Sequence, residues 1–210
     1  MTERLNNEQT TQEELANSLT HGIGLVIAII AFITFSDWQG NESEVLSLIV
    51  YGSTLFFLYA ASTLYHTVKT PKLKRIFQIL DHSAIYLFIA GCYTPVMFKI
   101  GNHDAMIVLT VIWGLAFLGV YIKSFHLEKT AVFGLVLYLL MGWLALVMIK
   151  SMIAVLPAGA LVWLFAGGAS YTLGVYFYVK DSIRFFHTVW HMFVLGGSWC
   201  HFHMIIFYTV

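Results

Sequence analysis

Charged residues are scarce in this chain, and their scarcity decides its class. Only 10% of the 210 residues are Asp, Glu, Lys or Arg, whereas 59% are hydrophobic. A soluble domain carries about 25% charged residues and at most about half apolar residues. The polar stretches are also too short to cover a hydrophobic core of their own. The composition therefore predicts a single integral membrane domain and excludes a second, soluble domain.

An excess of positive charge is absent as well, since eleven Lys and Arg residues balance eleven Asp and Glu residues. No nucleic-acid partner is therefore expected. Cysteine is rare, and both Cys92 and Cys200 lie inside apolar runs, where free cysteine behaves as a small hydrophobic residue. We expect free thiols rather than a disulfide framework. The first residues are polar and acidic, a pattern that does not predict a cleaved signal peptide.

Seven apolar runs follow, each near the length needed to cross about 30 Å of hydrocarbon. Short links join them, so neighbouring runs must be antiparallel. We predict an all-α fold, an integral membrane bundle of seven transmembrane helices within residues 20–210. Residues 1–19 form a cytoplasmic N-terminal segment in which Thr11-Gln12-Glu13-Glu14 offers a capping box, and a short amphipathic helix is expected there. The predicted spans are 20–36, 45–67, 79–99, 104–123, 131–150, 158–179 and 186–208.

The positive charges predict the orientation of this bundle, because short cytoplasmic loops retain Lys and Arg. Nine of the eleven lie on the side of the N-terminus, and only Lys99 and Lys150 lie opposite. We therefore expect a cytoplasmic N-terminus and, after seven crossings, a C-terminus outside. The nine are Arg4, Lys69, Lys72, Lys74, Arg75, Lys123, Lys129, Lys180 and Arg184.

Histidines carry the main chemical signal of the sequence. His187 and His191 are four residues apart at the start of the last run, so on a helix they project from one face about 6 Å apart along the axis. His66 ends the second run and Asp81 opens the third. In the predicted topology all four residues lie at the cytoplasmic ends of their helices. His21 and His82 join the same layer.

This set of residues predicts a zinc site. Imidazole nitrogens suit zinc, and three protein ligands with an open fourth position are typical of catalytic zinc. Such a site activates water near pH 7. Asp81 would hold or deprotonate the water, and Ser62, one turn before His66, would orient it.

Other interpretations of the same residues stay open. A single histidine in a span more often bonds a neighbouring helix, and Asp81 could instead be the N-cap of the third helix. The sequence assigns no role to His21, His82 or His201.

The motifs together resemble those of the hemolysin III family, the bacterial branch of the progestin and adipoQ receptor superfamily, which also resembles alkaline ceramidases. The resemblance covers nearly the whole chain. It implies seven helices with the N-terminus inside, in a bacterial plasma membrane, and zinc held by His66, His187 and His191 with Asp81 and Ser62 close to the bound water. The matching residues are Glu14-Leu15-Ala16-Asn17-Ser18-Leu19-Thr20-His21-Gly22, Ser62-x-x-x-His66, Asp81, and His187-x-x-x-His191.

Three functions remain compatible with the sequence. The first is an intramembrane zinc hydrolase that cleaves an amide or ester of a membrane lipid, the lipid being its substrate or ligand. The second is a cytolysin or pore former, although the chain lacks the soluble, amphipathic character of a secreted one. The third is a non-catalytic sensor of membrane state with structural zinc, which would not require an open coordination position. The sequence predicts no oligomeric state.

Overall fold

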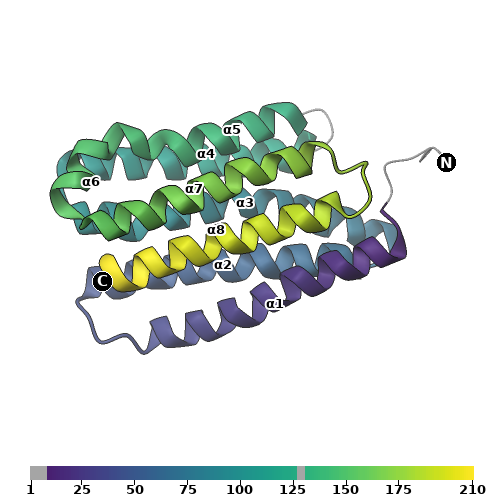
Figure 1. Cartoon of the computed structure of the whole chain (residues 1–210), viewed down its shortest axis with the longest axis horizontal. Helices are drawn as coiled ribbons and strands as arrows, with labels where there is room; N and C mark the ends of the chain where they lie inside the picture. Colours follow the sequence, from purple (N-terminus) through teal and green to yellow (C-terminus); the bar gives the residue numbers. More distant parts are fainter. Residues whose placement is uncertain (1–8, 127–130) are drawn as a thin grey trace.

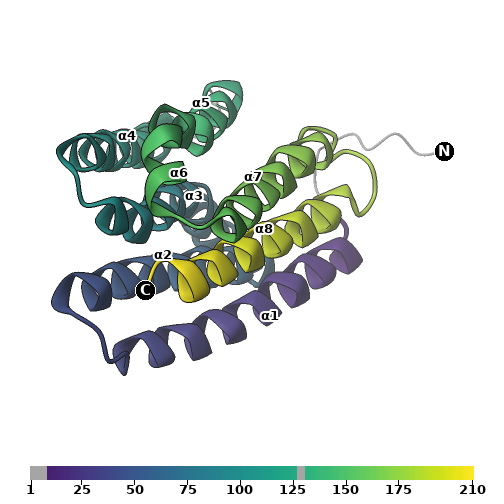
Figure 2. The same cartoon turned by 60° about the vertical axis from the view of Figure 1, so that its left-hand side comes forward.

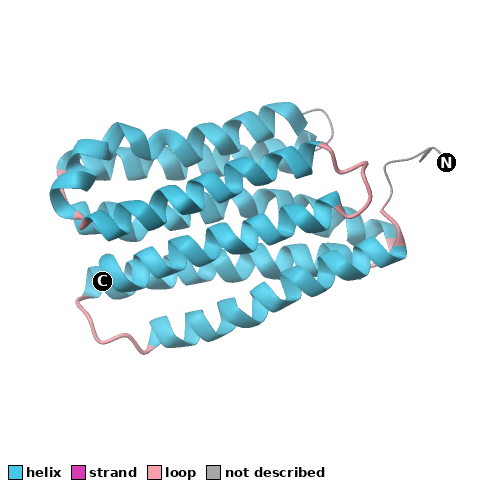
Figure 3. Cartoon of the chain, viewed as in Figure 1, coloured by secondary structure: helices cyan, strands magenta, loops and turns pink. Residues whose placement is uncertain are grey.

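The computed structural model describes residues 9–126 and 131–210, and the elements of that part of the chain are helices (Figure 3). The long helices lie side by side along one direction (Figure 1). The start of α1 and the end of α8 consequently lie at opposite ends of the bundle. The elements are α1 Thr11–Ser36, α2 Glu42–Thr67, α3 Pro71–Ile100, α4 His103–His126, α5 Ala131–Trp143, the 3₁₀ helix η1 Leu144–Met148, α6 Ile149–Val155, α7 Ala158–Val179 and α8 Phe186–Tyr208.

Six helical stretches of the described chain are long and apolar enough to cross a membrane, and the bundle fits an integral membrane protein. Large hydrophobic side chains such as Ile30, Phe117 and Val132 lie exposed on its outside, as expected of a surface that faces lipid rather than water. α8 has 23 residues and no acidic or basic side chain other than histidine. It is not among the six because its four histidines make it more polar.

Helix packing brings the first and last helices of the chain together. α1 packs against α2 and α8, α8 packs against α7, and α3 packs against α2 and α4 (Figures 1 and 2). Glycine permits close approach between α7 and α8, where a Cβ on Gly197 would lie 2.5 Å from the ring of Tyr171. The cytoplasmic ends predicted for the first, second and last spans are thereby adjacent.

The fifth predicted span, 131–150, is interrupted. α5 ends at Trp143, and the chain passes through η1 before it resumes as α6 and continues to Val155. A 3₁₀ turn leaves carbonyl groups poorly satisfied. The hydroxyl of Tyr93 on α3 donates to the carbonyl oxygens of Met141 at 2.7 Å and Gly142 at 3.2 Å. A neighbouring helix therefore stabilises the interruption.

The N-terminal boundary differs from the expectation. α1 begins at Thr11, and residues 11–19 are its first turns rather than a separate short helix, because neither proline nor glycine interrupts this stretch. The capping box also lies one residue earlier than predicted, since Thr10 is the N-cap and Glu13 closes the box. Residues 1–8, including Arg4, lie outside the described residues, as does Lys129.

The start of α3 corrects a second expectation. The helix begins at Pro71, ahead of the predicted limit at residue 79, because proline suits the first helical position. Its N-cap is Thr70. The interpretation of Asp81 as the N-cap of this helix is therefore wrong, and Asp81 instead lies inside the helix.

Candidate metal centre

Three histidines from two helices converge near the starts of α1 and α8. His66 lies in the last turn of α2, whereas His187 and His191 occupy the first two turns of α8. One nitrogen of each ring lies within 4.8 Å of a nitrogen of the other two. The ring centroids are 5.2 Å apart for His66 and His187, 5.0 Å for His66 and His191, and 4.7 Å for His187 and His191. Three imidazoles thus surround one point.

The start of α8 is held in place by α1. Phe185, the N-cap of α8, has a positive φ of 62°, which is uncommon for a residue with a side chain. Its backbone N–H donates to Oε1 of Glu13 at 2.9 Å. Thr188 also donates to Asn17 Oδ1, at 2.5 Å. α1 therefore fixes where α8 begins, and with it the positions of His187 and His191.

The unsatisfied nitrogens in this cluster fit a metal ion. Within the described part of the chain, His66 Nε2 and His187 Nδ1 are buried without a hydrogen-bond partner. A buried polar atom left in this way costs about 1–3 kcal/mol, and a cation would take up a lone pair of each imidazole. A set of three imidazole nitrogens suits zinc, copper, iron and nickel. The residues present thus fit a metal site without choosing the element.

His21 and His82 lie beside the cluster but differ from its members. The ring of His21 stacks on that of His191 with centroids 3.5 Å apart, and neither nitrogen of His21 has a partner among the described residues. His82 Nδ1 lies 2.8 Å from the carbonyl oxygen of Gln78. The predicted layer of histidines therefore exists, but among the described residues only His66, His187 and His191 form a group with metal-ligand spacing.

Ser62 and Asp81 line the same cavity as His187 and His191. Ser62 is fully buried, and its hydroxyl has no partner in the described chain. The side chain of Asp81 is 15% exposed, and its Oδ2 lies 3.8 Å from Nδ1 of His82. The structure thus brings both predicted residues to the site, while their roles stay predictions.

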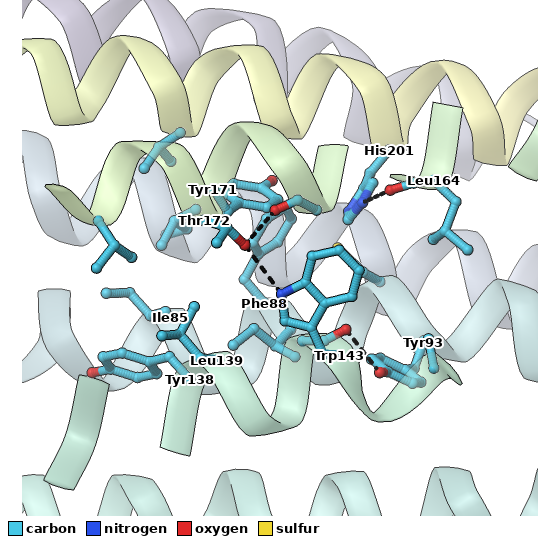
Figure 4. A pocket seen from close by; sticks show the side chains of 18 of the residues that line it. Ile85, Phe88, Tyr93, Tyr138, Leu139, Trp143, Leu164, Tyr171, Thr172 and His201 are labelled. Carbon is cyan, nitrogen blue, oxygen red and sulfur yellow. Dashed lines mark hydrogen bonds between the residues drawn. The ribbon is translucent and has the colours of Figure 1, made fainter. Parts of the chain in front are cut away.

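The cavity has a volume of ≈ 170 Å³ and extends from this polar end along the helices to Met97 and Met204. Most of its lining is apolar. Figure 4 shows the part between α5 and α7, where the indole N–H of Trp143 donates to Thr172 Oγ1 at 3.1 Å. An apolar cavity of roughly 150 Å³ is large enough to hold a benzene-sized molecule, so this one offers room for part of an apolar ligand.

His201 faces the same cavity but serves another purpose. Its Nε2 donates to the carbonyl oxygen of Leu164 on α7 at 3.3 Å (Figure 4). It lies ten residues beyond His191, about 15 Å along the helix axis, and does not belong to the metal group. His201 is therefore an interhelical hydrogen-bond partner.

Sequence reasoning missed the groups on α1 that contact the histidines. Oε2 of Glu14 lies 2.6 Å from Nδ1 of His66. The carbonyl oxygen of Asn17 and Oγ1 of Thr20 each lie 3.3 Å from Nδ1 of His191. A signal was present in the sequence, because Glu14, Asn17 and His21 are spaced i, i+3 and i+7 and form one polar stripe along the first turns of α1.

Comparisons with known proteins match nearly the whole chain to one family of proteins. A family described as Haemolysin-III related matches residues 9–202. The chain is 39% identical over 215 residues to Hemolysin-3 of Bacillus cereus, covering 100% of this chain and 98% of that protein. It is 38% identical over 207 residues to the Hemolysin-3 homolog of Bacillus subtilis (strain 168), covering 96% of each. Monocyte to macrophage differentiation factor of Homo sapiens is 31% identical over 208 residues, covering 93% of this chain and 84% of that protein.

Proposed function

The chain belongs to the hemolysin III family of membrane proteins, and from this premise we propose that it holds zinc and hydrolyses an amide or ester bond of a membrane lipid. His66, His187 and His191 would be the ligands. The observation that carries the proposal is the cavity, which is lined at one end by His187, His191, Asp81 and Ser62 and elsewhere by apolar side chains suited to a hydrocarbon chain. His66 belongs to the same histidine group as His187 and His191.

The proposal includes a place for the site in the membrane. The N-terminus would lie in the cytoplasm and the C-terminus outside, in a bacterial plasma membrane, with α8 as the seventh span. Support comes from the sequence, in which nine of the eleven Lys and Arg residues are predicted to lie on the side of the N-terminus and two on the opposite side. The site would then lie near the cytoplasmic face, at the depth where an acyl chain joins its headgroup.

Each polar residue of the site has a distinct role in this proposal. Zinc, when bound, supplies a Lewis acid and an activated water molecule. Asp81 accepts a proton from the water and returns it to the departing amine or alcohol, so that water is added across the cleaved bond. Ser62 orients the water through its hydroxyl, which has no other partner among the described residues.

The test is lipid hydrolysis by the purified full-length protein in bilayers. Ceramide-like lipids and phospholipids would be supplied, and released fatty acid measured by mass spectrometry. We expect Asp81→Asn to retain zinc and lose turnover, because the amide cannot accept the proton. His66→Ala should lose both zinc and turnover.

Two outcomes would replace this proposal. If the wild type releases no more fatty acid than Asp81→Asn or a metal-stripped sample, a sensor with structural zinc becomes the better account. The two Bacillus relatives are called Hemolysin-3 or its homolog, so leakage of a vesicle dye is measured in parallel. Equal leakage by the wild type and zinc-free variants would favour a pore former that acts without the metal.

A further inference from the structure

We propose that Glu14 is a positioning residue for His66: its carboxylate determines which ring nitrogen carries the proton and so presents Nε2 to the metal. This inference rests on the metal site proposed above and on no assumption about hydrolysis. It assigns a role to a residue of α1 that supplies no ligand itself.

The first step concerns the proton on His66. Nδ1 of this ring lies 2.6 Å from Oε2 of Glu14. An ionised carboxylate only accepts hydrogen bonds, so Nδ1 carries the hydrogen and donates it. In a neutral ring the lone pair then belongs to Nε2. Nε2 is buried and has no partner within residues 9–126 and 131–210, which leaves it available to a cation.

The second step concerns what holds the carboxylate. Nζ of Lys74 on α3 donates to the other oxygen of Glu14 at 2.6 Å and to the carbonyl oxygen of Tyr65 at 3.1 Å. The ammonium group also lies over the ring of Tyr65, 4.6 Å from its centroid. Glu14 thus has one oxygen for Lys74 and one for His66. The contact joins α1, α2 and α3 and keeps the carboxylate charged.

The third step compares the other histidines of the group. His191 Nδ1 has only longer contacts, 3.3 Å each, to the Asn17 carbonyl oxygen and Thr20 Oγ1. His187 Nδ1 is without a partner in the described chain. His66 is the member with a short contact to a carboxylate. A partner of this kind orients the ring and raises its basicity, and its loss typically lowers metal affinity about 10- to 100-fold.

The experiment measures zinc affinity of the full-length protein in lipid nanodiscs, after removal of metal, by titration against a competing chelator. We expect Glu14→Ala to weaken zinc binding about 10- to 100-fold. Glu14→Gln should lose less zinc affinity than Glu14→Ala, because its amide oxygen still accepts a hydrogen bond from Nδ1 of His66. Lys74→Met is the matched control, since it breaks the same ion pair but leaves the contact between Glu14 and His66. Lys74→Met should weaken zinc binding less than Glu14→Ala does.

A double-mutant comparison separates positioning from general support of the fold. In a His66→Ala background, Glu14→Ala should cause no further loss of the weak residual zinc affinity that His187 and His191 provide. An equal loss in both backgrounds, or equal effects of Lys74→Met and Glu14→Ala, would show that Glu14 acts only as a tie between helices and would overturn the proposal. So would unchanged affinity in Glu14→Ala.

A direct measurement does not depend on whether the variants fold. Nitrogen-15 NMR of the histidine-labelled, zinc-loaded wild type should show His66 protonated at Nδ1 and bound through Nε2, and the opposite assignment would overturn the proposal. A wild type that binds no zinc would refute both the proposed metal site and this inference. A wild type that binds zinc but hydrolyses no lipid would refute only the proposed hydrolase activity.

Discussion

If the proposed zinc site is correct, replacing His191 with alanine should abolish the stabilisation that zinc would give to the folded protein. His191 is 2% exposed and belongs to the three-histidine group. The variant keeps only His66 and His187, one from α2 and one from α8, and loses the chelating pair on a single helix. It also loses the ring that stacks on His21 at 3.5 Å, so the metal-free protein is destabilised too. The informative quantity is therefore the difference between zinc-loaded and metal-free stability.

The size of that difference follows from mass action. A ligand that binds only the folded state, at a free concentration of about 100 times its Kd, stabilises it by about 2.7 kcal/mol. Loss of a supporting residue alone costs up to about 100-fold in metal affinity, and loss of a ligand should cost at least that. At the same zinc concentration the variant would then have a Kd no lower than that concentration. Its zinc-dependent stabilisation would be at most about 0.4 kcal/mol.

Thermal unfolding with and without zinc, in one detergent or nanodisc, measures the effect. His201→Ala is the matched control, since it removes a partly buried histidine from the same helix and breaks a contact to Leu164. His201→Ala should lower the stability of the zinc-loaded and the metal-free protein equally and leave the difference between the two unchanged. Elemental analysis supplies an independent readout. Full zinc occupancy in His191→Ala, with wild-type stabilisation by zinc, would refute the assignment of this residue as a ligand.

Two further predictions concern the fold. Cysteines placed at Thr2 and Val210 should be labelled from opposite sides of the membrane, as detected with a membrane-impermeant reagent, and labelling of both from one side would exclude the proposed topology. Gly197→Ala should lower the free energy of unfolding by about 1–3 kcal/mol, because its Cβ would lie 2.5 Å from the ring of Tyr171. Chemical denaturation should show no such loss for Gly114→Ala, whose Cβ would meet nothing within 4 Å.

The positions of the helices were largely predictable because lipid imposes a length of apolar sequence on each span. The features that the sequence did not predict lie where the length of an apolar run gives no information. The first turns of α3 contain Lys72, Lys74 and Arg75, which look like a loop to a hydrophobicity criterion although Pro71 favours a helix start. The 3₁₀ segment at 144–148 has no breaking residue in its sequence, Leu-Ala-Leu-Val-Met. Its stabilisation by Tyr93 depends on another helix.

The histidine group was predictable for a different reason. Spacing of four residues places His187 and His191 on one helical face, and the charge-based topology gives His66 the same depth. Depth in the membrane alone does not predict which helices are adjacent. The contact between Glu14 and His66 could therefore be recognised only from the packing of α1 against α2 in the structure. His82 shows the converse limit, because its shared depth did not make it part of the metal group.

The use of α2 and α8 for one site has a consequence for biogenesis. A nascent chain synthesised through α7 contains His66 and Glu14 but neither His187 nor His191. One imidazole is a poor metal site, so tight binding of the proposed zinc would have to await insertion of α8. Metal capture would then report that synthesis is complete, and it would join the earliest helices to the last one. An intermediate without α8 would also expose the polar stripe of α1, making it a recognisable substrate for membrane quality-control proteases.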